Sequence, residues 1–129
     1  MPLKLSLRPQ EKLFIGGAVM QNGEHTAELT ILNDVPLLRE KDVMTEDEAS
    51  TPCKRIYLCV QLMYMDPAHL GGYQVSYRDL QEQVLQAAPS TAPHLAEIDH
   101  HLACGRYYQA IKAARQLMDY EQELLTHVS

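Results

Sequence analysis

Residues 3–17 read LKLSLRPQEKLFIGG, and this stretch decides the fold of the first third of the chain. Leucine alternates with polar residues at positions 3 to 7, which is the period-2 pattern of a strand with one buried face. Pro9-Gln10 interrupts the pattern, and a second strand over 12–15 stops at Gly16-Gly17. We therefore predict two short strands at the start of the chain.

Three further strands are expected before residue 40. Residues 18–20 and 27–31 flank Asn22-Gly23, a strong hairpin signal because both turn residues tolerate positive φ. The fifth strand covers 35–39, where Pro36 cannot donate to a neighbour and favours an edge position. Five short antiparallel strands in about 40 residues predict a small barrel or sandwich. A unit of this size cannot bury enough apolar surface to be stable alone. It must therefore dimerise or pack against the rest of the chain.

From residue 45 the apolar period becomes that of a helix. Thr45 to Glu48 reads as a capped acidic turn, and Thr51-Pro52 reads as the N-cap and first residue of a helix ending near Asp66-Pro67. A second helix, delayed by Gly71-Gly72, is expected up to Ala88.

A third helix opens at residues 90–93, and a long final helix follows Gly105. The final helix is expected to carry apolar residues along one side: Tyr107, Ile111, Ala114, Met118 and Leu125. The chain is thus predicted to be α+β, with a β domain over 1–43 and a bundle of three to four helices over 44–129.

Composition limits the possible functions. The 129 residues carry a formal net charge of −6, which excludes nucleic-acid binding through bulk positive charge. The charge divides into −1 over 1–43 and −5 over 44–129, so the strand half repels a polyanion less. The sequence has no bilayer-spanning apolar run and no evident signal peptide, so we expect a cytoplasmic protein that does not insert into membranes.

Catalytic and metal-binding signals are weak. The sequence contains neither a phosphate-binding glycine-rich loop nor a G-x-S-x-G motif, so we expect no enzyme. His100 and Cys104 would lie one helical turn apart, but two ligands are too few for a closed zinc site. We therefore expect no cofactor and no metal, and we expect the three cysteines to be buried free thiols.

Several separate motifs resemble, in one order over nearly the whole chain, the FlbT family of flagellar biosynthesis proteins. They are Met1-Pro-Leu-Lys-Leu-Ser-Leu-Arg-Pro, Val19-Met-Gln-Asn-Gly, Leu38-Arg-Glu-Lys-Asp-Val-Met, Thr51-Pro, Arg55-Ile-Tyr, Met63-Tyr, Tyr107-Tyr-Gln-Ala, Arg115, Leu117 and Tyr120-Glu. The resemblance implies a cytoplasmic post-transcriptional regulator that acts on the 5′ untranslated region of flagellin mRNA, usually as a repressor. It also implies a functional pairing with a second flagellar regulator, FlaF.

Residues 5–16 and 35–40 are also similar to the carbon storage regulator family, CsrA, whose patterns are Leu-Thr-Arg-Arg-x-Gly-Glu-x-Leu-x-Ile-Gly and Val-x-Val-His-Arg-Glu. Gln10 stands where the first pattern has its glycine. The resemblance implies an intertwined β homodimer, in which the first strand of one chain lies beside the last strand of the other and this seam binds an RNA loop. The RNA contacts that it implies are Leu5, Ser6, Arg8, Leu37, Leu38, Arg39 and Glu40, with Arg39 at the most important position.

Two hypotheses follow. In the first, the β domain dimerises and binds the flagellin mRNA leader, with Arg8 and Arg39 brought together if the first and fifth strands are neighbours; otherwise these arginines are solvated or pair with Glu11 and Glu40. In the second, the acidic helical half, rich in Tyr, Met and Leu, is an adaptor that grips an amphipathic helix of flagellin or FlaF. Its expected partner-binding residues are Met63, Tyr64, Arg106 and Tyr108. Arg106 and Tyr108 are also the alternative RNA site, because an exposed tyrosine stacks on bases.

Overall fold

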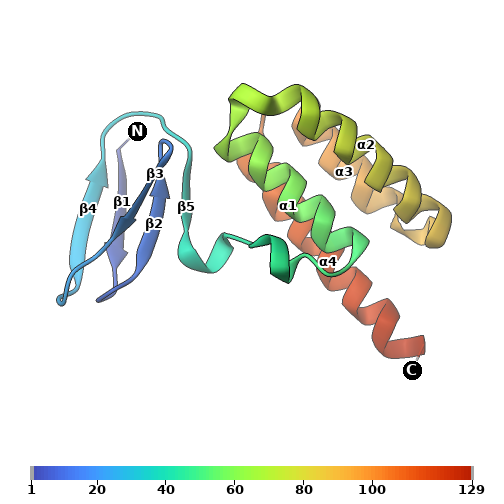
Figure 1. Cartoon of the computed structure of the whole chain (residues 1–129), viewed down its shortest axis with the longest axis horizontal. Helices are drawn as coiled ribbons and strands as arrows, with labels where there is room; N and C mark the ends of the chain where they lie inside the picture. Colours follow the sequence, from blue (N-terminus) through green and yellow to red (C-terminus); the bar gives the residue numbers. More distant parts are fainter. Residues whose placement is uncertain (1, 129) are drawn as a thin grey trace. The chain divides into compact units, whose positions relative to one another are not determined.

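A computed structural model describes residues 2–128, and the fold is α+β as predicted, with strands first and helices second (Figure 1). The chain forms two compact units, and the boundary between them falls between Val43 and Met44. The strands of the first unit are β1 (Leu3–Leu7), β2 (Lys12–Ile15), β3 (Ala18–Gln21), β4 (Ala27–Ile31) and β5 (Leu37–Arg39). The helices of the second unit are α1 (Pro52–Met65), α2 (Leu70–Ala87), α3 (Ala92–Ala103) and α4 (Tyr107–Val128).

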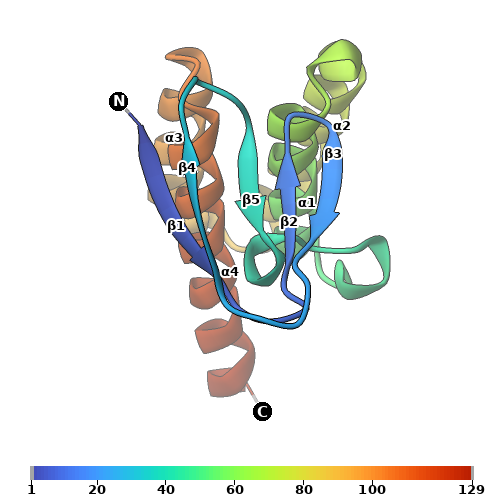
Figure 2. The same ribbon diagram turned by 90° about the vertical axis from the view of Figure 1, so that its left-hand side faces the viewer.

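The five strands form two antiparallel sheets rather than a closed barrel. One sheet pairs β1 with β4, and the other has the order β3-β2-β5 (Figure 2). β3 and β4 therefore belong to different sheets, so the hairpin predicted at Asn22-Gly23 is wrong. The hairpin that forms instead joins β2 to β3 through Gly16 and Gly17, whose φ angles of 54° and 88° suit glycine. β5 is shorter than predicted, because Val35 and Pro36 lie outside the strand.

The core of the β unit is small. Among residues 2–43, the buried apolar side chains are Leu7, Leu13, Phe14 and Leu38. β1 alternates only in part, since Leu3 is 50% exposed, and β3 is exposed along its whole length. A two-stranded sheet with so few buried side chains is marginal by itself.

The helical unit is built from clear local signals. Thr51 accepts a hydrogen bond from the Lys54 N–H and caps α1, with Pro52 as the first helical residue, and Thr45 with Glu48 forms a capping box. These two predictions are confirmed. α1 packs on α2 and α4, and α3 packs on α4. The fully buried large side chains of this core are Ile56, Tyr57, Val60, Leu95, Ile98 and Leu117.

Two expectations for the helices are wrong. Gly71 and Gly72 do not delay α2, which begins at Leu70 directly after a 3-10 turn over Pro67–His69. Leu125 is 53% exposed rather than packed, because the last turns of α4 extend beyond α1 and α3 (Figures 1 and 2). Within residues 2–128, none of the helices combines the length and apolar character that a bilayer-spanning segment needs.

Candidate functional site

Arg39, at the end of β5, connects three segments of the β unit. Its guanidinium donates to both carboxylate oxygens of Glu11, just before β2, at 3.1 to 3.2 Å. Its Nη2 also donates to the backbone carbonyl of Ser6 in β1. Arg39 is thus paired with Glu11, which is one of the alternatives that the sequence left open.

Glu11 itself is fixed by the loop that carries Arg8. Its Oε1 accepts the Arg8 N–H at 2.9 Å. This backbone hydrogen bond is the largest cause that holds the pKa of Glu11 below its ordinary value, and pairing with Arg39 adds to the effect. The carboxylate is therefore a stable anion that positions both arginine-bearing segments.

The loop over residues 8–11 depends on two residues that the sequence analysis did not place in the site. The Asn22 side-chain amide donates to the carbonyls of Leu7, Arg8 and His25. Gln10 has a φ of 64°, in the left-handed region that favours glycine, and its N–H donates to Gly23 O at 2.9 Å. This is the position where the carbon storage regulator pattern has glycine, so the backbone of this loop is consistent with that resemblance.

These residues surround an open pocket of about 530 Å³. Its lining residues are Arg8, Pro9, Gln10, Glu11, Arg39, Glu40 and Lys41. Three of the seven are cations, and one of these, Lys41, was not predicted. The lining also includes the carboxylates of Glu11 and Glu40. A local cluster of arginine and lysine is suited to phosphate oxygens and unpaired bases, even on a chain whose net charge is negative.

The other strand residues implied as RNA contacts do not line this pocket, although the Ser6 carbonyl accepts a hydrogen bond from Arg39. Leu5 and Ser6 line a second open pocket on the β1–β4 sheet, and Leu37 is half-buried. The Leu38 side chain is only 1% exposed and belongs to the core, so this side chain is not available for contact. The structure therefore gathers Arg8, Arg39 and Glu40, and it removes the Leu38 side chain from the surface.

The residues expected to bind a partner are also partly buried and partly on the surface. Met63 is 2% exposed, because it packs inside the helical unit, whereas Arg106 lies on the surface. The Tyr64 and Tyr108 rings are neighbours, with centroids 6.3 Å apart, and the Lys112 Nζ lies 4.9 Å from the Tyr108 ring centroid. Tyr108 is 40% exposed.

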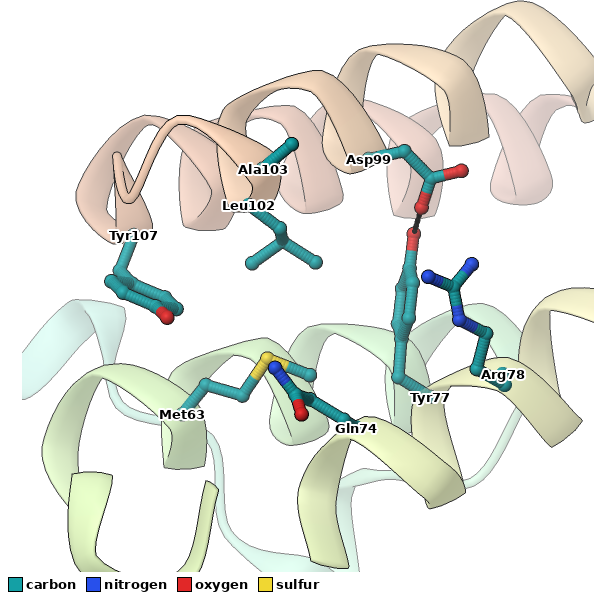
Figure 3. A pocket seen from close by; sticks show the side chains of 8 residues that line it. All are labelled: Met63, Gln74, Tyr77, Arg78, Asp99, Leu102, Ala103 and Tyr107. Atoms are coloured by element: carbon teal, nitrogen blue, oxygen red, sulfur yellow. Dashed lines mark hydrogen bonds between the residues drawn. The ribbon is translucent and has the colours of Figure 1, made fainter. Parts of the chain in front are cut away.

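A pocket of about 400 Å³ opens between α2 and the end of α3 (Figure 3). Met63, Leu102, Ala103 and Tyr107 form its apolar part, and Gln74, Tyr77, Arg78 and Asp99 form its polar part. Tyr77 donates to Asp99 Oδ1 at 2.7 Å, and Gln81 donates to Oδ2 at 2.6 Å. Burial, and then the bond to Asp99, raises the pKa of Tyr77, so this hydroxyl stays neutral. The sequence analysis did not place Tyr77 in a site.

The three cysteines differ in their surroundings. Cys53 and Cys59 are buried, as expected, but Cys104 is exposed, because it directly follows α3 in the turn before α4. Over the described part of the chain, no three His, Cys, Asp or Glu side chains form a group suited to holding a metal ion.

Comparison with known proteins gives a consistent result over nearly the full length. The family described as flagellar protein FlbT matches residues 3–125. A probable flagellum biosynthesis repressor protein FlbT of Rhodopseudomonas palustris (strain TIE-1) is 38% identical over 98% of this chain and 99% of the relative. The flagellum biosynthesis repressor protein FlbT of Caulobacter vibrioides (strain ATCC 19089) is 37% identical over the whole chain and 93% of the relative. No solved structure matches this chain.

Proposed function

This chain belongs to the FlbT family of flagellar proteins, and on that premise we propose that it represses flagellum biosynthesis by binding the 5′ untranslated region of flagellin mRNA. The names of its relatives support the repressor role. The observation that carries the RNA part of the proposal is the arrangement of Arg8, Glu11 and Arg39 around one open pocket of the β unit.

The chemistry of this pocket favours single-stranded RNA. Loop bases are recognised by arginine planes, backbone groups and stacking rather than by net charge. Glu11 holds the Arg39 guanidinium through two oxygens, which leaves its orientation defined before any ligand arrives. A side chain that is already ordered loses less conformational entropy on binding.

The edges of the sheets favour a homodimer as the RNA-binding form. Among the described strands, β1 pairs only with β4, and β5 pairs only with β2, so each has one edge with no strand beside it. An edge strand can accept a further strand into its sheet. Pairing β1 of one copy with β5 of a second copy would enlarge both sheets, and the twofold symmetry would present the Arg8–Arg39 pocket twice.

The test is binding of the purified full-length protein to flagellin leader RNA, with a scrambled RNA of the same length and a salt titration. We expect selective, saturable binding, and we expect Arg39→Ala to weaken it about 5- to 100-fold, as for loss of one well-made arginine contact. Lys12→Ala is the matched control, because it removes an exposed cation of the β unit that does not line the pocket.

Three results would contradict this assignment. Full affinity in both Arg8→Ala and Arg39→Ala would remove the pocket from the site. A scrambled RNA that binds equally well would remove selectivity. No binding at low salt would remove the RNA mechanism and leave the repressor role to another contact. Light scattering on the same samples tests the dimer, whose expected mass is twice 14.6 kDa.

A second candidate function is an adaptor that binds flagellin or FlaF through the helical unit, and the pocket in Figure 3 favours it. The pocket has an apolar floor suited to one anchoring side chain of an amphipathic helix, with Arg78 at its side for a carboxylate. Ala103→Trp would fill the pocket from an exposed position and should abolish capture of the partner. Ala87→Trp is the control, because Ala87 is exposed nine residues beyond Arg78 on α2, about 14 Å along the helix.

A further inference from the structure

An aromatic pair lies where α1 meets α4, with Tyr108 exposed and Tyr64 half-buried. Tyr64 lies near Tyr108, whereas Tyr57, two turns earlier in α1, lies beneath Arg115, two turns later in α4. The two helices therefore run antiparallel, and their facing side chains form successive rungs. The first rung is Tyr64 with Tyr108, and the next is Tyr57 with Arg115.

Packing does not account for Tyr108. The following residues Ala110 and Ile111 are buried at 0% and 3% exposure, whereas Tyr108 is 40% exposed. A ring that remains 40% exposed gains less from burial than a core side chain does. Its neighbours are a second ring and an ammonium group, which are the partners of a π surface rather than of a hydrophobic core.

Cations follow the exposed ring along α4. Positions 108, 112 and 115 are spaced by four and three residues, so they share one helix face. Lys112 lies on the face of the Tyr108 ring, and the Arg115 guanidinium lies 5.1 Å from the Tyr57 ring centroid and donates to its hydroxyl at 2.9 Å. Across residues 2–128, no carboxylate lies within ion-pair distance of the Lys112 ammonium.

The chain enters the helical unit beside this surface. Gln61, one turn before Tyr64, accepts the Met44 N–H at 2.7 Å and donates to the Met44 carbonyl at 3.0 Å. Met44 is the first residue of the helical unit. The first residue of the helical unit is therefore anchored on the same stripe of α1 that carries Tyr64.

We propose that Tyr108, with Tyr64, Lys112 and Arg115, forms a second binding surface for single-stranded RNA, separate from the pocket of the β unit. A base stacks on the face of Tyr108 that Lys112 does not cover, and Lys112 and Arg115 contact the phosphates of the same strand. Single-strand binding proteins combine these two elements, a stacking ring and a row of cations. The surface acts locally although the helical unit carries −5, because salt screens charges more than about 8 to 10 Å away. This inference rests on the RNA-binding function proposed above.

The test compares Tyr108→Ala with Tyr108→Phe in the full-length protein, using the flagellin leader RNA. Loss of the ring should weaken binding about 5- to 100-fold, whereas phenylalanine keeps the π surface and should change affinity less than about twofold. Lys112→Ala should lower the slope of log affinity against log salt by about 0.7. Arg55→Ala is the charge-matched control, because Arg55 is exposed on α1, nine residues from Tyr64 and on the opposite side of that helix.

Cross-linking gives a readout that a purely structural role of Tyr108 would not produce. RNA containing 4-thiouridine should cross-link to Tyr108 or Tyr64 in the wild-type protein, and the yield at this surface should fall in Tyr108→Ala. Circular dichroism confirms that each variant keeps its helices.

The outcomes separate this inference from the proposed function. If Arg39→Ala loses RNA binding while Tyr108→Ala and Lys112→Ala keep it, the second surface is wrong and the β-unit site stands. If Tyr108→Ala keeps RNA affinity but no longer captures flagellin or FlaF, the surface binds protein and this inference is overturned. A wild-type protein that binds no RNA overturns both proposals.

Discussion

Arg39 in β5 donates to both carboxylate oxygens of Glu11, and Glu11 in turn accepts the backbone N–H of Arg8. This single carboxylate therefore fixes the position of both arginines that line the pocket. Its side chain is 14% exposed against 32% for Arg39, so the anion is the more protected partner of the pair. A change in the charge of Glu11 should therefore weaken the contacts of both the Arg8 loop and β5.

Acid should weaken the β unit through Glu11. Because the pKa of Glu11 is lowered in the folded protein, its contribution to stability is complete above about pH 4.5 and is lost as the pH falls through the lowered value. Glu11→Gln should unfold at a lower temperature than the wild type at pH 7, and the difference should shrink as the pH falls below about 4.5. Thermal unfolding across this range, with Glu24→Gln in an exposed turn as control, checks the prediction. A difference that does not change with pH would contradict it.

Alanine substitutions at the two glycines of the β2–β3 turn should distinguish the cost of a steric clash from the cost of backbone strain. A Cβ at Gly16 would lie 2.8 Å from Cγ2 of Val35, whereas a Cβ at Gly17 would meet nothing within 4 Å. Both residues have positive φ. Gly17→Ala should lower the free energy of unfolding by about 1 kcal/mol, and Gly16→Ala by about 1 to 3 kcal/mol more. Chemical denaturation measures both, and equal losses would show that Val35 moves aside at no cost.

Alkaline conditions should weaken the helical unit through Tyr77. The pKa of this hydroxyl is raised above its ordinary value of 10.0 by burial and by its bond to Asp99, so its contribution is complete below about pH 10 and is lost as the pH rises further. Tyr77→Phe should cost about 1 to 2 kcal/mol at pH 7, because one part-buried carboxylate oxygen loses its donor.

The matched control for Tyr77 is Tyr120→Phe. The Tyr120 hydroxyl donates to Ser90 Oγ at 2.6 Å at an exposed position, so its loss should cost less than about 0.5 kcal/mol. Chemical denaturation at pH 7 and above pH 10 gives both values. A Tyr77→Phe variant as stable as the wild type would show that the bond to Asp99 adds nothing to the fold.

The three thiols should react at very different rates. Burial raises the pKa of Cys53 to about 12 and that of Cys59 to about 11, and Glu121 adds to the effect at Cys53. Cys104 is exposed. A disulfide reagent should therefore modify one thiol rapidly and the other two only after unfolding, because the thiolate is the nucleophile. Cys104→Ser should abolish the rapid phase, and rapid reaction of all three thiols in the native protein would contradict the burial.

Local signals predicted the elements of this fold well. Thr51 and Pro52 mark the start of α1, and the spacing of apolar residues after them predicts the helices. These signals are reliable because a helix cap and a helix face each depend on residues close together in the sequence. Predictions failed where a local preference was opposed by packing elsewhere in the same element. Gly71 and Gly72 are poor helix formers, yet α2 contains them, because packing along the rest of the helix outweighs about 1 kcal/mol for each glycine.

The sequence by itself determined the order of strands and helices, the two-part organisation of charge and the resemblance that led to Arg39. Only the tertiary structure decided which strands pair, that Glu11 holds Arg39, that Asn22 supports the Arg8 loop, and that Tyr64 meets Tyr108. The partners in the last three of these contacts lie between 14 and 44 residues apart. The alternation or capping pattern of a segment does not specify which distant segment it contacts, because that contact depends on the packing of the whole unit.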